Sequence, residues 1–144
     1  MNRSALIVGA GSGLSSSLAL QCTNLGMDVA LAARNIEKLE DLGTQTRASL
    51  HKCDASKIED VHRLFKDLDE KLGIPELVVY NPSARLRGAI ETLDPKKTKE
   101  ALDVTCFGAF LVAQQAATRM LKRGSGSIFF TGASAGVKGF ANSS

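Results

Sequence analysis

The sequence predicts an α/β fold in which a mainly parallel, doubly wound sheet of five strands carries helices on both faces. Short apolar runs alternate along the 144 residues with segments whose apolar residues recur every three or four positions. No repeat, low-complexity tract or linker interrupts this alternation. Residues 1–144 are therefore predicted to form a single domain.

Five apolar runs are predicted to be strands. The first, Ala5–Val8, is continuous and ends at Gly9, which is typical of a strand buried on both faces of a parallel sheet. The other predicted strands are 29–33, 48–53, 77–80 and 127–131, with loops at 81–92 and 132–144. The run 48–53 is the weakest and is predicted to lie at an edge. A sheet that stops at the fifth strand leaves Ile128–Phe130 as an exposed apolar edge.

Four connecting segments are predicted to be helical. The apolar faces of the first three are formed by Leu14, Leu18, Cys22 and Leu25, by Ile36, Leu39 and Leu42 ahead of a stop near Gly43, and by Ile58, Val61, Phe65, Leu68 and Leu72. Ser56 is a candidate N-cap of the third helix, and Glu59 completes a capping box. The fourth helix is predicted to begin at Pro95, after Asp94, and to end at about Lys122.

The composition is that of an ordinary globular protein, with 44% apolar and 23% charged residues. The net charge of +3 is small and the basic residues are scattered, which argues against a nucleic-acid partner. We expect no membrane partner, because no apolar stretch reaches the roughly 20 residues that span a bilayer and the chain does not start as a signal peptide. Cys22, Cys53 and Cys106 lack metal-site spacing. We expect no metal, and buried, reduced thiols in a cytoplasmic protein.

The junction between the first predicted strand and helix is a glycine loop, Gly9-Ala10-Gly11-Ser12-Gly13-Leu14. Glycine lets the backbone turn tightly and approach a phosphate closely, and the first amides of a helix favour an anion. The loop follows a buried strand and opens a helix, as a dinucleotide-binding loop requires. We therefore expect Gly9, Gly11, Ser12, Gly13 and Leu14 to hold the pyrophosphate of a dinucleotide in a Rossmann-type domain. The alternative is a simple turn.

The end of the second predicted strand indicates which dinucleotide is bound. NAD-binding folds carry an acid about 20 residues past the glycines, which bonds the ribose 2′-hydroxyl. This chain has no acid there, and Arg34 instead offers a planar cation suited to a 2′-phosphate. The expected cofactor is NADP(H), ahead of NAD(H). In the alternative interpretation, Arg34 is a solvated surface residue.

The glycine loop resembles the TGxxxGxG signature of the short-chain dehydrogenase/reductase family. Gly9 takes the place of the first glycine and Gly13 that of the second, while Ser15 replaces the third glycine and Val8 the threonine. The resemblance extends strand by strand over essentially the whole chain. It implies a Rossmann-type domain whose C-terminal part is missing from these 144 residues, since the last strands and helices of the family fold have no counterpart.

The resemblance also assigns roles to residues after the third and fourth strands. It implies that Asp54, followed by Ala55, bonds the adenine amino group; the alternative is an acid that shapes a turn or cap. Asn81 matches the first position of the family's NNAG run. It implies that Asn81, Pro82 and Ser83 lie beside the cofactor ribose; the alternative is an ordinary turn.

The family reacts through a Ser–Tyr–Lys set, often assisted by Asn, that performs acid–base chemistry beside a hydride carrier. By this resemblance Thr105 occupies the Asn position and Ala133 the Ser position, which leaves Ser134, one residue on, as the candidate catalytic serine. Tyr80 is the only tyrosine, and no Tyr-x-x-x-Lys pattern is present. The family spacing places that pair past Ser144, so the chain is either a shortened piece or a degenerate relative.

The expected function is therefore that of an NADP(H)-dependent oxidoreductase acting on a small carbonyl or alcohol substrate. The alternative is a non-catalytic module that binds a dinucleotide. A third possibility is a domain for another nucleotide-bearing ligand such as S-adenosylmethionine, which Ala33 and Arg34 disfavour because many methyltransferases have an acid there. His51 and His62 are expected to be structural or solvated. The resemblance also implies a homo-oligomer through the long helix at 95–122, whose apolar residues include Phe107, Phe110, Leu111 and Met120.

Overall fold

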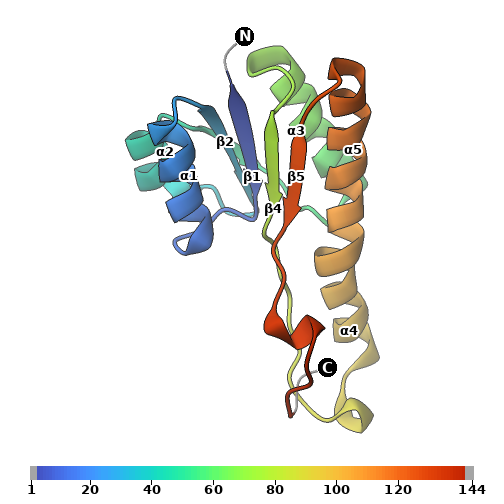
Figure 1. Cartoon of the computed structure of the whole chain (residues 1–144). Coiled ribbons are helices and arrows are strands. Elements are labelled where there is room, and N and C mark those ends of the chain that lie inside the picture. The colour runs from blue at the N-terminus through green and yellow to red at the C-terminus, as the bar shows by residue number, and fades with distance from the viewer. Residues whose placement is uncertain (1–2, 142–144) are drawn as a thin grey trace.

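The computed structural model describes residues 3–141 and contains one parallel sheet with the strand order β3-β2-β1-β4-β5 (Figure 1). The strands are β1 (Ser4–Val8), β2 (Asp28–Ala33), β3 (Ser49–Lys52), β4 (Leu77–Tyr80) and β5 (Ser127–Phe130). Ile7 of β1 pairs with Leu31 of β2 and with Val79 of β4. The prediction of a five-stranded α/β fold is confirmed, as is the edge position of β3.

Helices cover both faces of the sheet, as predicted. Helices α1 (Leu14–Asn24) and α2 (Glu40–Thr46) pack on one face, and α3 (Ile58–Lys71) and α5 (Gly108–Arg123) on the other (Figure 1). Because side chains alternate along a strand, Ala5 and Ile7 of β1 join the first core and Leu6 and Val8 the second. All five residues of β1 are buried, so this strand fixes where both helical layers sit.

The apolar face predicted for α1 is wrong in part. Ser15, Ala19 and Cys22 are buried, whereas Leu14 and Leu25 are 54% and 58% exposed. Small side chains let a helix pack close to a sheet. This close packing, rather than the spacing of the leucines, decides which face of α1 is buried. The register of α1 therefore presents its smallest residues to β1 and β2.

The second helical segment differs from the prediction at both ends. It opens as a 3-10 turn, η1 (Glu37–Leu39), and α2 then continues past Gly43 to Thr46. Gly43 lies inside the helix and does not stop it. The glycine instead leaves room for the neighbouring side chain, because a Cβ there would lie 3.1 Å from Leu50 Cδ2. The helix ends instead at Arg47, which adopts the left-handed conformation with φ 55°.

The capping box predicted for α3 is also wrong. The helix begins after Lys57, and no side chain caps it. Ser56 is held elsewhere, because its N–H and hydroxyl both donate to Asp54 Oδ1, at 3.1 and 2.7 Å. The Asp60 carboxylate in turn accepts the Asp54 N–H at 2.8 Å. These bonds shape a turn between β3 and α3 that keeps Asp54 in place.

The long helix predicted at 95–122 is interrupted. It begins as predicted, at Pro95, with Asp94 Oδ1 accepting the N–H groups of Lys96 and Lys97. Helix α4 (Pro95–Leu102) then passes into a π-helical turn at 103–107 before α5 starts. Short 3-10 turns at 90–92 and 134–136 lie within the two predicted loops, of which 142–144 are outside the described residues.

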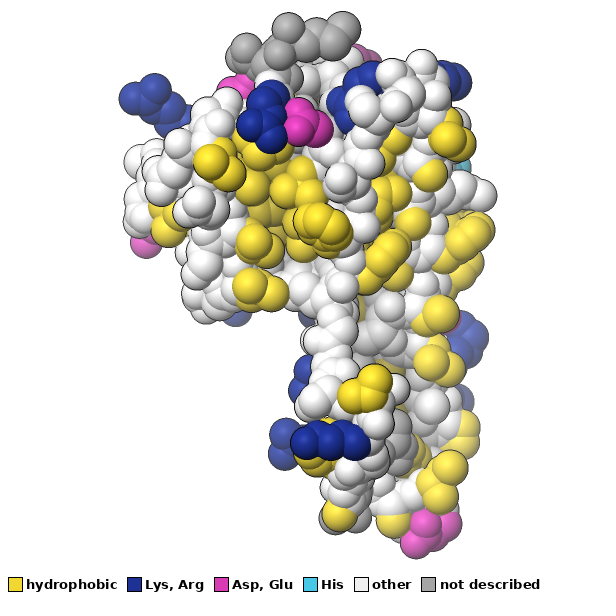
Figure 2. Space-filling model, in the orientation of Figure 1, with side chains coloured by type: hydrophobic (Ala, Val, Ile, Leu, Met, Phe, Trp, Pro, Cys, Tyr) yellow, Lys and Arg dark blue, Asp and Glu magenta, His cyan; other side chains and the backbone are white. Residues whose placement is uncertain are grey.

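Apolar side chains are exposed around β5, as predicted for this edge. Phe129 and Phe130 are 59% and 54% exposed, and Figure 2 shows hydrophobic side chains on the sheet face between α1 and α5. Residues 3–141 include no helix that combines the length and apolarity needed to cross a bilayer.

The thiols follow the prediction in two of three cases. Cys22 and Cys53 are free and buried. Cys106, which lies in the π-helical turn, is free but exposed.

His51 is a buried imidazole on the edge strand β3. Its Nε2 lies 2.9 Å from Ser49 Oγ, and its Nδ1 lies 3.9 Å from Asp67 Oδ2. Burial lowers the pKa of His51; Asp67 opposes this shift and Lys71 adds to it. His62 is exposed on α3. Neither histidine lines the cavity described below, which agrees with the structural or solvated roles expected for them.

The lowered pKa of His51 predicts a pH dependence of stability. Below about pH 6.5 the unfolded chain protonates this histidine while the folded chain resists protonation. The unfolded state then binds more protons, so the free energy of unfolding is largest above this pH and falls as the pH drops below it. Urea unfolding at a series of pH values between about 7.5 and 5 measures this slope. His51→Gln should flatten it and His62→Gln should not; an equal slope in all three proteins would contradict the assignment.

Candidate functional site

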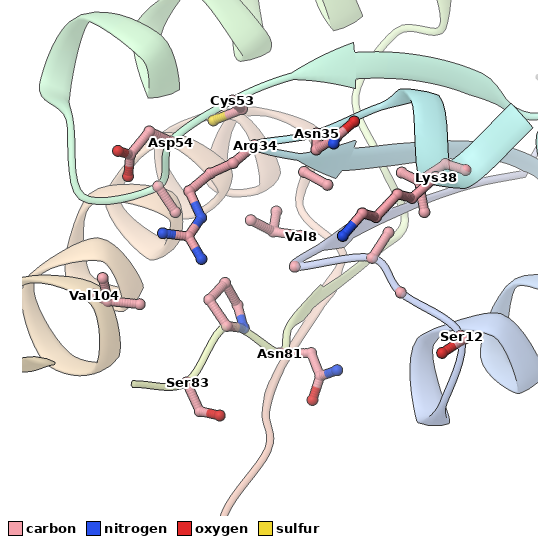
Figure 3. Close-up of a pocket in the computed structure, with 17 residues that line it drawn as sticks. Val8, Ser12, Arg34, Asn35, Lys38, Cys53, Asp54, Asn81, Ser83 and Val104 are labelled. Carbon is pink, nitrogen blue, oxygen red and sulfur yellow. The ribbon is translucent and has the colours of Figure 1, made fainter. Parts of the chain in front are cut away.

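A cavity of about 570 Å³ lies at the carboxyl ends of the strands. It is lined by residues 8–12, 33–35, 53–55 and 81–83, by Lys38 and Leu39, and by Val104 from the π-helical turn (Figure 3). The strand order reverses here, because β1 is followed by β2 and β3 on one side and by β4 and β5 on the other. Open parallel sheets bind ligands at such a switch point.

Gly9 turns the chain out of β1 and could not be another residue without strain. Its φ is +77°, and a Cβ there would lie 2.5 Å from the nitrogen of Pro82. The N–H groups of Gly9 and Ala10 donate to the Ala32 carbonyl at 2.9 and 3.1 Å, which ties the loop to β2. Conformation and space both require glycine at this position.

The rest of the loop leaves open space in front of α1. A Cβ at Gly11 or Gly13 would meet no atom within 4 Å. Gly13 is the N-cap residue, no side chain caps the helix, and its first turn contains no acid. The positive end of α1 is therefore available to an anion rather than neutralised by the protein.

Ser15 connects the glycine loop to the segment after β4. It is buried, its hydroxyl donates to the Gly9 carbonyl at 3.2 Å, and it accepts the Asn81 amide at 2.8 Å. The Asn81 backbone N–H also donates to the Val8 carbonyl at 2.9 Å. The residue that departs from the third glycine of the signature is thus a bridge between two walls of the cavity.

Two cations share the cavity at the end of β2. Arg34 follows the strand and Lys38 lies on η1, and both side chains line the cavity (Figure 3). Neither forms a salt bridge within residues 3–141. Among the described residues that line the cavity, Asp54 is the only acid. This end of the site can therefore accept a strongly negative group.

Cys53 and Asp54 directly follow β3 and form one wall of the cavity. Asp54 lines the cavity, and its Oδ1 also holds the turn through Ser56. Burial, followed by the nearby Asp60 carboxylate, raises the pKa of the Cys53 thiol to about 12. Cys53 is therefore a neutral side chain in the wall rather than a nucleophile.

Most of the predicted cofactor residues come together here. Gly9, Gly11, Ser12, Arg34, Asp54, Ala55, Asn81, Pro82 and Ser83 line the cavity, whereas Gly13 and Leu14 lie just beyond its lining. The cavity is also lined by residues that no sequence motif indicated: Val8, Ala10, Ala33, Asn35, Lys38, Leu39, Cys53 and Val104. The sequence does contain an indication for Lys38, since it is a second cation only four residues after Arg34. Val104 gave no local signal.

The predicted catalytic serine is not brought to this cavity. Ser134 begins an exposed 3-10 turn after β5 and is absent from the lining. The Thr105 hydroxyl donates to the Ala101 carbonyl of its own helix at 2.6 Å. Within residues 3–141, no three His, Cys, Asp or Glu side chains are grouped as metal ligands.

The sequence is similar to oxidoreductases from distant organisms. "Farnesol dehydrogenase" of Aedes aegypti is 32% identical over 126 residues, which cover 83% of this chain and 51% of that protein. An uncharacterized oxidoreductase of Caenorhabditis elegans is 28% identical over 136 residues, covering 88% of this chain and 44% of the relative. The chain thus spans about half the length of these curated relatives.

Solved structures share the fold and identify the family. A short-chain type dehydrogenase/reductase from Mycobacterium marinum superposes with a TM-score of 0.91 at 26% identity, over 96% of this chain and 58% of that one. Actinorhodin polyketide ketoreductase, solved with NADPH, gives a TM-score of 0.93 at 25% identity, over 99% of this chain and 57% of that one. Because the model of the short chain dehydrogenase family also matches residues 3–144, the chain belongs to that family.

Proposed function

We propose that the cavity binds NADP(H) and that the chain is the cofactor-binding part of an oxidoreductase acting on a carbonyl or alcohol substrate. One observation carries the proposal: an uncapped helix N-terminus and two cations without salt bridges face one cavity of about 570 Å³. That volume is within the ordinary range for ligand sites. When bound, the nicotinamide group supplies or accepts the hydride. Membership of the family and the ketoreductase solved with NADPH support this choice of cofactor.

The glycine loop would hold the pyrophosphate. The amides from Ser12 to Leu14 lead through the N-cap Gly13 into the positive end of α1, and no acidic side chain in the first turn opposes an anion. The open space at Gly11 and Gly13 allows phosphate oxygens to approach the backbone. Gly9 has the different task of keeping the loop clear of Pro82.

The two cations would hold the 2′-phosphate. Arg34 offers a planar donor pair and Lys38 a mobile point charge, and both project into the cavity beside the end of β2. Asn35, next along the chain, is a neutral amide whose Oδ1 accepts the Glu37 N–H at 3.0 Å, so no carboxylate stands at this position to bind a 2′-hydroxyl. This charge distribution favours NADP(H) over NAD(H).

The segments after β3 and β4 would hold adenine and ribose. Asp54 and Ala55 lie below β3, where the carboxylate can accept the adenine amino group while its Oδ1 keeps the turn in place. The backbone from Asn81 to Ser83 would lie along the ribose, and the bond from Asn81 to Ser15 keeps this segment beside the glycine loop.

A second candidate function, a dinucleotide-binding module without catalysis, is favoured by the positions of the reactive residues. Thr105 stands at the family's Asn position, and its hydroxyl is engaged by its own helix. Ser134, the candidate catalytic serine, does not line the cavity. Measurable NADPH oxidation with a panel of carbonyl compounds would support the enzyme, and tight binding without turnover would support the module.

We also propose self-association through the helical rod of α4 and α5. Leu102, Phe107 and Phe110 are exposed, and the two phenylalanine rings stack with centroids 6.2 Å apart. Three large exposed apolar side chains along one helical rod, two of them in contact, are better suited to a partner than to water.

Substitutions at Gly11 and Gly9 should affect different properties, ligand binding at Gly11 and stability at Gly9. Gly11→Ala should leave the free energy of unfolding within about 0.5 kcal/mol of wild type, because nothing lies near the new methyl group. It should weaken NADPH binding about tenfold or more, because the methyl group enters the phosphate space. Gly9→Ala should destabilise the fold by roughly 1–3 kcal/mol, through its positive φ and Pro82. Calorimetric titration and urea unfolding measure the two effects. Unchanged binding by Gly11→Ala would argue against a phosphate there.

Arg34→Ala should discriminate between the two nicotinamide cofactors. Removing a charged hydrogen bond of about 1.5–3 kcal/mol should weaken NADPH binding roughly 10- to 150-fold and leave NADH binding nearly unchanged. The matched control is Lys66→Ala, which removes the same charge from an exposed position on α3. Equal losses for NADPH and NADH, or an equal loss in the control, would exclude a specific 2′-phosphate contact.

Phe110→Glu should abolish self-association. Phe110 is 55% exposed in the single chain, and a buried unpaired charge would oppose burial of this surface in a dimer. Sedimentation velocity should show a wild-type dimer and a variant monomer. Leu25→Glu, which changes an apolar residue of similar exposure at the end of α1, should remain dimeric. A monomeric wild type would refute the proposal.

A further inference from the structure

We propose that Tyr80 is a positioning residue that fixes the π-helical turn as one wall of the cofactor cavity. The inference rests on the proposed function, since it concerns how that cavity is held in shape. Three features carry it: the hydrogen bond made by the Tyr80 hydroxyl, the space around Gly108, and the place of Val104 in the cavity lining.

Tyr80 brings the chain's single phenol into the core at the end of β4. The residue is buried in the cluster between the sheet, α3 and α5. A buried hydroxyl requires a partner, and Tyr80 donates to the Val104 carbonyl, 24 residues further on. Burial raises the pKa of Tyr80, so the hydroxyl keeps its proton and remains a donor.

The same hydroxyl is not available for acid–base chemistry on a substrate. Its proton is directed to a backbone carbonyl, and its ring is covered by the core and by Phe130, whose centroid lies 6.5 Å away. The single tyrosine of this chain therefore has a structural partner rather than an open position in the cavity.

The carbonyl that Tyr80 contacts belongs to an irregular helical turn. Over Asp103–Phe107 the helix widens, and the Gly108 N–H donates to the Asp103 carbonyl five residues before it. A π-turn interrupts the regular ladder of helix hydrogen bonds, so the Val104 carbonyl can serve the phenol. The Val104 side chain meanwhile lines the cavity.

Gly108 allows this arrangement because it has no side chain. A Cβ there would overlap the Tyr80 hydroxyl and lie 2.8 Å from the Ala55 carbonyl oxygen. The end of β4, the cavity residue Ala55 and the π-helical turn thus meet at one point. A change in the turn would move Val104 relative to Ala55.

The residue after Tyr80 makes the matching contact on the other side. Asn81 bonds Ser15, and Ser15 bonds the Gly9 carbonyl. Two successive residues at the end of β4 therefore hold opposite walls: Tyr80 holds the turn that carries Val104, and Asn81 holds the glycine loop. Without the phenol oxygen, the Val104 carbonyl loses its partner and the π-turn can relax toward a regular helix.

Tyr80→Phe tests the proposal because it removes only the hydroxyl. We expect NADPH and 2′,5′-ADP to bind about three- to tenfold more weakly, by the same factor, since the wall by Val104 and Ala55 faces the adenine half. Amide hydrogen exchange of residues 104–108, measured without ligand, should accelerate. The control is Leu68→Ala, a buried change on α3 that destabilises the core without touching the cavity. It should leave both affinities unchanged. It should also leave unchanged the ratio between the amide exchange rates of the π-helical turn and those of α5.

The outcomes separate this inference from the proposed function. If wild type binds NADPH and Tyr80→Phe binds it equally well, the positioning role is overturned and the proposed function stands. An equal loss of affinity in Leu68→Ala would reduce the effect to general stability and also overturn the role. If wild type binds neither NADPH nor 2′,5′-ADP, the proposed function fails, and the inference fails with it.

Discussion

The open amino-terminal end of α1 is the constraint on which the site depends. A helix leaves its first amides without partners, and here neither a capping side chain nor an acid satisfies them. The loop before the helix stays clear of those amides because Gly9 turns with a positive φ against Pro82. Three segments surround this end: β1 supports the loop, the segment after β2 brings the two cations, and the segment after β4 closes the cavity on another side. An anion at this position would supply the hydrogen-bond acceptors that the protein itself does not provide for the start of α1.

The cavity is held in shape by short contacts between segments that are distant in sequence. Ser15 joins the glycine loop to Asn81, and Tyr80 joins the end of β4 to the π-helical turn. Asp54 is held by its bond to Ser56. These hydrogen bonds are already in place in the chain without a ligand, so the walls that they join are held before anything binds. The same rigidity explains why single atoms, such as the phenol oxygen of Tyr80, can matter.

Much of the fold could be predicted from local patterns, and the rest depended on tertiary contacts. The strands and the glycine loop were evident because buried runs and turn residues act within a few positions. The cavity position of Arg34 followed from its place after β2. By contrast, the π-helical turn depends on Tyr80 and Gly108 meeting across the core, which no helical periodicity reveals. Lys38 reaches the site through the 3-10 turn η1, which the pattern of apolar residues did not predict. Ser56 does not cap α3 because its hydroxyl donates to Asp54.

A crystal structure of the chain with NADP⁺ tests the central claim most directly. The diphosphate should lie within hydrogen-bonding distance of the backbone amides from Ser12 to Leu14, with the 2′-phosphate between Arg34 and Lys38. A diphosphate bound elsewhere, or loop amides occupied by the protein's own side chains, would contradict it.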